Sequence, residues 1–250
     1  MSLVTIDNTT LTSIANAIRE KNGTTDAYKP SEMSTAISNI ETGGGSGGTY
    51  APRWITFKGY KGTELDYELE NLSTKNLESL SYMFEGNSKL INVKLKGGVP
   101  NVTTAAYMCR NCTKLVSVDC SEFRESVVTS ITYMFDGCTA LETVDMSNFA
   151  TPNLKSVTYA FNKCANLKYL NLSKMTIPEA TNVSYMFDGC TSLEYLDIRS
   201  MEFPSTITNT TCMIRQVPYY CEIIVKDDNA RNFLLSLRSE MSNIKTVAEL

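Results

Sequence analysis

The chain has 250 residues, 42% of them hydrophobic, and a formal net charge of −4, which is an ordinary composition for a folded globular protein. Acidic and basic residues are interspersed, so the charge provides no general attraction to nucleic acid, and no apolar run reaches the roughly 18 residues of a membrane span. The sequence contains no histidine, which excludes nucleophiles activated by histidine and metal sites that include it. An enzyme would have to work with carboxylate, lysine, tyrosine or cysteine side chains alone.

Residues 1–42 predict two short helices, because the stretches 10–23 ("TLTSIANAIREKNG") and 29–40 ("KPSEMSTAISNI") each repeat apolar residues at helical spacing. A helical pair of this size buries too little surface to be stable alone. It is either a hairpin that rests on the remainder of the chain or a docking or oligomerising segment that needs a partner. Its start has no basic region followed by an apolar stretch, so we expect no secretory signal peptide in this sequence.

Residues 43–48 ("GGGSGG") have the composition of a flexible linker. A linker of this kind joins parts that need not hold a fixed angle to one another. We therefore expect residues 49–250 to fold as a separate domain.

One phrase recurs along this domain: "YMFDGCTALETVDMSNF" begins at Tyr133 and returns at Tyr185 as "YMFDGCTSLEYLDIRSM". Five tyrosines aligned on it are 25, 26, 26 and 26 residues apart: Tyr82, Tyr107, Tyr133, Tyr159 and Tyr185. A fixed period of this length is typical of a solenoid, in which one unit cannot close its own hydrophobic core and successive units stack. We call each repeating unit a coil.

Each coil contains an L-x-x-[VL]-x-[LCMI] run, such as residues 193–198, whose end alternates apolar and polar residues as a strand does. Stacked coils would align these strands into a parallel sheet. The segment before the run, such as "TNVSYMF" at 181–187, predicts a turn that leads into a short helical or 3₁₀ piece on the opposite side. The predicted fold is a repeat solenoid, a leucine-rich-repeat-like stack with one short parallel strand per coil of 25–26 residues.

This pattern resembles the BspA-type leucine-rich repeat of bacterial surface proteins, in its variant of about 26 residues, "MF-x-G-C-x-x-L-x-x-L-D-L-S-x-F", over residues 75–225. An open stack needs capping units at its ends. "PRWITFKGY", with Trp54, predicts the N-terminal cap. A sixth coil looks decayed, since Thr211 and Cys212 stand where tyrosine and methionine are expected.

The C-terminal tail is similar to the segment that often closes such repeats. It predicts a last strand at Cys221–Val225 and then a helix near Asn229–Ser239. Phe233, Leu234 and Leu237 are expected on the inward side of this helix.

The N-terminal stretch "LTSIANAIREKNGTTDAYKPSEMSTAISNI" resembles a leader found on phage and prophage tail-associated proteins of Gram-positive bacteria. The resemblance implies a place in a phage tail, with residues 1–42 attached to the tail or to sister chains. It also explains the missing signal peptide, because virion proteins leave the cell by lysis. The alternative location is the bacterial cell surface.

Most of the eight cysteines are expected to be free thiols used for packing. Four of them recur in register as Cys112, Cys138, Cys164 and Cys190, and the same column holds Asn87 in the first coil, which a disulfide ladder would not tolerate. Cys109 and Cys112 form a C-x-x-C, but both fill repeat columns and have no second pair, so we predict no zinc site. Cys212 and Cys221 lie outside the ladder, and their pairing stays open.

In each predicted strand the residues between the inward ones face solvent and form two columns. The second column is nearly uniform, with Lys94 followed by Asp119, Asp145, Asn171 and Asp197, and a uniform column is usually structural. The first column varies and is the better place for recognition: Asn92, Ser117, Thr143, Tyr169 and Tyr195. Tyr169 and Tyr195 are the strongest candidates, because exposed tyrosine offers rigid area with a polar tip. Cross-strand packing is the alternative interpretation.

The ligand-binding candidates are therefore Tyr169, Tyr195, Thr143, Ser117, Asn92, Asp145, Asn171 and Asp197. We expect a non-enzymatic binding module that recognises a host-surface protein or glycan, with no cofactor, metal or catalytic residue. A spacer without a ligand is the second hypothesis. A polysaccharide-degrading enzyme is a third, since Asp119, Asp145 and Asp197 superficially fit paired-carboxylate hydrolysis. Active sites are usually departures from a repeat, however, and these acids belong to it.

Overall fold

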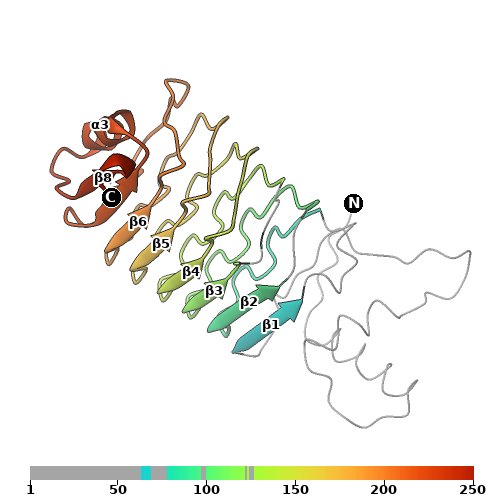
Figure 1. The fold of residues 1–250 in the computed structure, drawn as a ribbon. Helices are drawn as coiled ribbons and strands as arrows, with labels where there is room; N and C mark the ends of the chain where they lie inside the picture. Colours follow the sequence, from blue (N-terminus) through green and yellow to red (C-terminus); the bar gives the residue numbers. More distant parts are fainter. Residues whose placement is uncertain (1–62, 69–77, 97–99, 122, 124–126) are drawn as a thin grey trace, which may run out of the picture.

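The computed structural model describes residues 63–68, 78–96, 100–121, 123 and 127–250. Eight strands form one parallel sheet in chain order from β1 to β8, so each inner strand pairs with the one before it and the one after it (Figure 1). The strands are β1 (Glu64–Glu68), β2 (Asn92–Lys96), β3 (Ser117–Asp119), β4 (Thr143–Asp145), β5 (Tyr169–Asn171), β6 (Tyr195–Asp197), β7 (Glu222–Val225) and β8 (Ile244–Thr246). The predicted solenoid with one strand per coil is confirmed.

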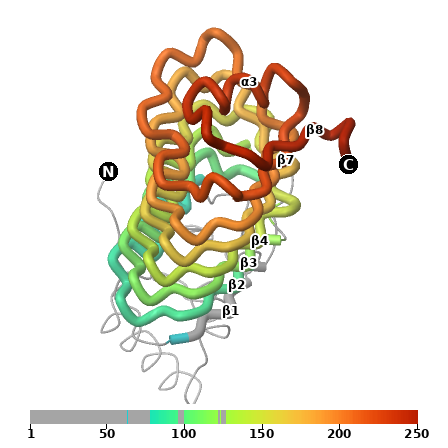
Figure 2. Tube along the Cα trace, turned by 90° about the vertical axis from the view of Figure 1, so that its left-hand side faces the viewer, coloured from blue at the N-terminus to red at the C-terminus, as the bar shows by residue number. Residues whose placement is uncertain are grey.

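The register of the sheet places equivalent repeat positions side by side. Val144 pairs with Leu170, and Leu170 pairs with Leu196, so the inward side chains of successive strands stack. Seen from the C-terminal end in Figure 2, the coils follow one another in chain order as similar loops. Each position in a coil therefore forms a column that runs the length of the stack.

The core consists of these inward columns. The phenylalanine column stacks ring on ring, with centroids 5.5 Å apart between Phe135 and Phe161 and 5.8 Å apart between Phe161 and Phe187. The methionine, leucine and cysteine columns beside it are buried as well, for example Met134, Leu167 and Cys164. Stacking thus buries apolar faces that one coil alone would leave exposed.

The segment opposite the strands differs in detail from the predicted helical or 3₁₀ piece. Backbone N–H groups do bond the carbonyl three residues earlier, but only at every second residue, as from Met134 to Ile131 and from Asp136 to Tyr133. The N–H groups between them cross to the next coil, as from Phe135 to Ala160 at 2.8 Å. The result is a row of tight turns that are bonded both within and between coils.

Left-handed backbone explains why no helix forms there. Tyr82, Tyr107, Tyr133, Tyr159 and Tyr185 have φ between 57° and 62°. The position four residues later is also left-handed in each coil, at Gly86, Asn111, Gly137, Lys163 and Gly189. Right-handed helix cannot continue through such residues, and the glycine of the repeat pattern suits a conformation that other side chains adopt at a cost.

The sixth coil is intact, so the expected decay is wrong. Its left-handed residue is Cys212, with φ 55°, and the next left-handed residue is Gln216. Tyr185 donates its N–H to Thr211 at 2.9 Å, as Tyr159 does to Ser184 in the coil before. Cys212 therefore replaces the tyrosine, 27 residues after Tyr185, and one extra residue had shifted the alignment.

The C-terminal cap has the predicted strand and helix. Strand β7 is followed by helix α3 (Asp228–Leu237), whose first turn is capped by the Asp227 side chain accepting from Ala230 N–H at 3.0 Å. Leu234 is buried in the core, and Phe233 and Leu237 pack against it, half-buried. The predicted last strand is not the last, because the chain returns after α3 as β8, parallel to β7, and ends in the 3₁₀ helix η3 (Val247–Glu249).

The predicted helices in residues 1–42, the linker at 43–48 and the Trp54 cap lie outside the described residues. Among the residues that are described, none belongs to a helix with the length and apolar character to cross a membrane.

Candidate functional site

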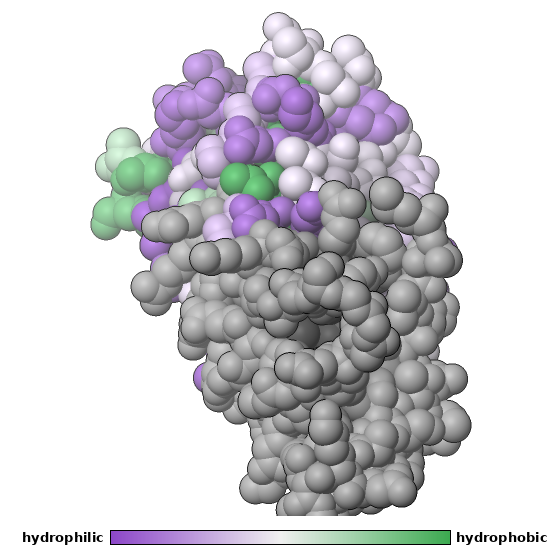
Figure 3. Space-filling view, turned by 90° about the vertical axis from the view of Figure 1, so that its right-hand side faces the viewer, coloured by the Kyte–Doolittle hydropathy of each residue, from purple (hydrophilic) through white to green (hydrophobic). Residues whose placement is uncertain are grey.

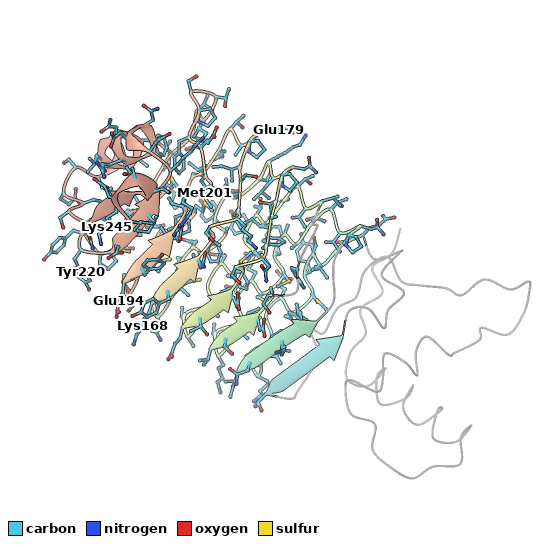
Figure 4. The ribbon with its side chains drawn as sticks, in the orientation of Figure 1. Lys168, Glu179, Glu194, Met201, Tyr220 and Lys245 are labelled. Carbon is cyan, nitrogen blue, oxygen red and sulfur yellow. The ribbon has the colours of Figure 1, made fainter. Side chains whose placement is uncertain are left out.

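The outer face of the sheet carries the two predicted columns. The register sets Tyr169 between Thr143 on β4 and Tyr195 on β6, and sets Asn171 between Asp145 and Asp197. Thr143, Tyr169, Asp145 and Asn171 are exposed, while Tyr195 is half-buried. Figure 4 shows Lys168 and Glu194 along the edge at which β5 and β6 begin. The structure therefore brings most candidates on β4, β5 and β6 together on one surface, but the prediction that Asp197 faces solvent is wrong, because this residue is buried.

The uniform second column is structural, as its uniformity predicts. The side-chain oxygens of Asp119, Asp145 and Asn171 each accept the backbone N–H two residues later, all at 3.0 Å, and Asp197 does the same at 3.1 Å. This turn ends each strand and satisfies a backbone donor that has no partner in the sheet.

Two ion pairs neutralise charge on this face. Lys94 Nζ lies 3.1 Å from Asp119 Oδ2. The Arg199 guanidinium donates to both carboxylate oxygens of Asp197, and Asp197 is only 2% exposed. Burial raises the pKa of Asp119, but hydrogen bonds from Ser121 and the ion pair with Lys94 outweigh it, so that pKa lies below its ordinary value. The bond to Asp197 raises the pKa of Arg199.

The aspartates of the hydrolysis hypothesis are thus spread over three coils, and each is bonded to its own turn. Within the described ranges, moreover, no three cysteine, aspartate or glutamate side chains converge in a way suited to a metal ion.

Each strand-face tyrosine is held at its hydroxyl group. Tyr169 donates to Glu194 Oε2 at 3.2 Å, and Tyr195 donates to Asp197 Oδ2 at 3.2 Å. The bond to Glu194 raises the pKa of Tyr169, and burial together with Asp197 raises the pKa of Tyr195. Both phenols therefore stay protonated at neutral pH. Tyr169 still leaves 56% of its surface exposed.

The N-terminal part of the variable column fits the packing interpretation better. Ser117 Oγ donates to Asn92 Oδ1 at 2.6 Å across the strands, and both residues are half-buried. The two side chains are therefore bonded to each other, and less of this part is exposed to solvent than of the part around Tyr169.

Sequence reasoning missed a second array, the tyrosine ladder on the turn side. The five aligned tyrosines stack with ring centroids 4.9, 5.0, 4.5 and 4.5 Å apart and planes within 10° of parallel. The Arg110 guanidinium lies 5.4 Å and 5.5 Å from the rings of Tyr107 and Tyr133. In the sequence these tyrosines mark the repeat. An aromatic residue at a fixed period in a stack also predicts ring-on-ring packing.

A polar column three residues after each tyrosine was missed too. It reads Glu85, Arg110, Asp136, Asn162, Asp188 and, in the shifted sixth coil, Arg215. Neighbours bond across coils: Arg110 lies 3.5 Å from both Glu85 and Asp136, Asn162 donates to Asp136 at 2.6 Å, and Arg215 grips Asp188. This column looks unpatterned in sequence because acidic, basic and amide side chains all occupy it.

The cysteine ladder is confirmed as packing. The thiols of Cys112, Cys138, Cys164 and Cys190 donate to backbone carbonyls of an earlier coil at 3.0–3.2 Å. All eight cysteines are free, so Cys212 and Cys221 are not paired. Burial raises the pKa of Cys138, Cys164 and Cys190, which keeps these thiols protonated and unreactive.

Two stretches, residues 56–143 and 103–224, match the family described as "Mycoplasma protein of unknown function, DUF285". Together they span residues 56–224, more than half of the 250 residues. The chain belongs to the DUF285 family. No curated protein and no solved structure matches the chain significantly.

The DUF285 match coincides with the coils and is compatible with the BspA-type resemblance. Residues 11–40, which resemble tail-associated leaders, lie outside both matched stretches. The family description assigns no activity.

Proposed function

We propose that this DUF285 protein is a non-enzymatic binding module whose sheet face around β5 recognises a ligand outside the cell. One observation carries the proposal: the variable column, set in an otherwise repetitive scaffold, places the large side chain of Tyr169 in solvent with 56% of its surface exposed. A position that changes while its surroundings repeat is free of the packing constraint that fixes the other columns.

The surroundings of Tyr169 favour recognition over cross-strand packing. Its hydroxyl bond to Glu194 fixes the side chain without covering the ring. A tyrosine held in this way loses little conformational entropy on binding, and a rigid aromatic residue with a polar tip is a common anchor in binding surfaces.

For the setting we propose a phage or prophage tail, with residues 1–42 attaching the module to the tail or to sister chains and the coils facing a host-surface protein or glycan. This proposal rests on the resemblance of residues 11–40 to tail-associated leaders. The BspA-type pattern of the coils favours a second setting, an adhesin on the bacterial cell surface. The binding face serves the same role in both.

The test measures retention of the labelled full chain on whole cells from a panel of Gram-positive bacteria. We expect Tyr169→Ala to weaken retention at least about tenfold, as truncation of an anchor residue does. Tyr219→Ala is the matched control, because Tyr219 is 58% exposed but lies outside the variable column. Retention that is unchanged in folded Tyr169→Ala protein would favour the spacer hypothesis.

A further inference from the structure

The turns that end β4 and β5 leave hydrogen-bonding atoms on the exposed side of the sheet. Asp145 Oδ1 accepts from both the N–H and the hydroxyl group of Ser147, and Asn171 Oδ1 accepts from the Ser173 N–H. No described residue bonds the other carboxylate oxygen of Asp145 or the amide nitrogen of Asn171. Because each side chain is fixed by its turn, an acceptor and a donor are presented at neighbouring positions of the sheet, one strand spacing of about 4.8 Å apart.

Tyr169 adds an aromatic platform on the same strand. It precedes Asn171 by two residues, so both side chains emerge on the outer face of β5. The bond from its hydroxyl to Glu194 restrains the ring, and Thr143 and Tyr195 flank it in register. A restrained aromatic ring beside planar polar side chains matches a sugar, whose ring has a face of C–H groups and a rim of hydroxyl groups.

The charges on this face argue against an anionic ligand. Lys94 and Arg199 are each paired with an aspartate of the second column. At the edge where the strands begin, exposed Glu142, Lys168 and Glu194 alternate in sign along neighbouring coils. An anionic ligand finds one lysine between two glutamates there, which gives it no net attraction.

The shortage of apolar surface argues against a protein partner. Protein interfaces concentrate their affinity in a desolvated apolar centre. Among the described strand-face residues, Tyr169 is the one large hydrophobic side chain that is exposed, and the others of this class are Tyr82, Val127, Tyr219, Tyr220, Val247 and Leu250. Figure 3, which views the molecule from the right-hand side of Figure 1, shows the apolar residues that are not grey as separate groups among polar ones.

We propose that Tyr169, Asp145 and Asn171 form a subsite for a neutral glycan. A sugar ring packs on Tyr169, and its hydroxyl groups donate to Asp145 and accept from Asn171. Further sugars of the chain follow the variable column across the strands, toward Thr143 on one side and Tyr195 on the other. This inference rests on the proposed function and names its ligand class.

The variants use substitutions that the repeat already contains. Asn171→Asp keeps the oxygen that caps the turn, as Asp145 and Asp197 do in the same column, but removes the amide donor. We expect it to weaken cell retention at least about threefold, and Tyr169→Ala at least about tenfold. Asp119→Asn is the control, because Asp119 lies in the same column in an earlier coil, and we expect no change. Equal weakening by the control would overturn the assignment of the subsite.

The ligand class is tested on the same cells. Periodate, which cleaves sugar diols, should abolish the Tyr169-dependent retention, whereas protease treatment of the cells and a rise from about 50 mM to about 500 mM NaCl should leave it unchanged. Tyr169-dependent retention that survives periodate, is lost with protease or falls steeply with salt would overturn the glycan and leave the binding module standing. Retention that never depends on Tyr169 would overturn both.

Discussion

Two rows of tyrosine lie on opposite sides of the solenoid, and they differ in nearly every physical respect. On the turn side, five tyrosine rings stack with neighbouring centroids 4.5–5.0 Å apart, and the backbone of each of these tyrosines is left-handed. On the strand side, Tyr169 and Tyr195 are neighbours in register, but each is bonded through its hydroxyl group to an acid. The first row repeats in every coil from Tyr82 to Tyr185, and the second begins only at β5.

The role of a tyrosine in this fold depends on which residues occupy the same repeat position in the neighbouring coils. A tyrosine whose neighbours along the stack are also tyrosines packs its ring against theirs and stabilises the fold. Tyr169, which appears late in a column of smaller polar residues, has a tyrosine neighbour on one side only and keeps 56% of its surface exposed. Perturbing the repeated columns should therefore change stability, and perturbing the variable column should change binding.

The largest change is expected from alkaline pH, which acts on many buried positions at once. Burial raises the pKa of Cys109, Cys120, Cys138, Cys164, Cys190 and Cys221, in the last case to about 12. Their stabilisation is complete below the ordinary thiol pKa of about 8.5 and is lost as pH rises toward the raised values, at roughly 1.4 kcal/mol per thiol and pH unit. Guanidinium unfolding under reducing conditions measures this. Equal midpoints at about pH 7 and about pH 10 would show that the thiols are not buried.

Truncating the phenylalanine column comes next. Phe161 is fully buried between Phe135 and Phe187, so Phe161→Ala should cost about 3–5 kcal/mol of unfolding free energy. Urea unfolding followed by circular dichroism gives the value. A loss below about 1 kcal/mol would mean that neighbouring coils do not depend on one another.

Substitutions in the tyrosine ladder should reduce the unfolding free energy by less than Phe161→Ala does, and glycine should be milder than alanine. Tyr159 stacks on Tyr133 and Tyr185 at 4.5 Å each, so Tyr159→Ala should cost about 1–3 kcal/mol. Because φ is 57° at this residue, Tyr159→Gly should be less damaging than Tyr159→Ala by about 1 kcal/mol, although glycine is normally the more destabilising choice. The same urea experiment ranks the two variants, and alanine as the milder change would contradict the left-handed assignment.

The smallest stability change is expected on the strand face. Tyr169→Ala removes an exposed ring and one exposed hydrogen bond, so the unfolding free energy should change by no more than about 0.5 kcal/mol. Thr143→Ala, in the same column, should behave alike. A loss of more than about 1.5 kcal/mol in Tyr169→Ala would place this residue with the packing columns and remove the basis for recognition.

The inward columns and the sheet were predictable, because period and alternation together decide which residues stack and which face out. The column from Asp119 to Asp197 was also readable as structural, since a repeated carboxylate or amide at a strand end suits a turn. Tyr169 followed as a candidate by departing from its column.

The rest depended on features that a single coil does not display. The left-handed tyrosines override any helical tendency of their segment, and nothing in one coil reveals that every second N–H will bond to the next coil. The pairing of Arg110 with Glu85 and Asp136 appears only once coils are stacked. One extra residue hid the sixth coil, and β8 was missed because its run, Ile244–Thr246, is too short to signal a strand by itself.

The strictly consecutive order of the eight strands has a genetic consequence. Since inner strands bond only to their immediate predecessor and successor, a tandem duplication or deletion of one whole coil leaves every remaining pairing possible. Such an event lengthens or shortens the molecule by one strand spacing, about 4.8 Å, and carries one more or one fewer position of the variable column with it. The length of the solenoid and the number of variable-column residues available to a ligand can therefore change together, one coil at a time, while the packing of the core is kept.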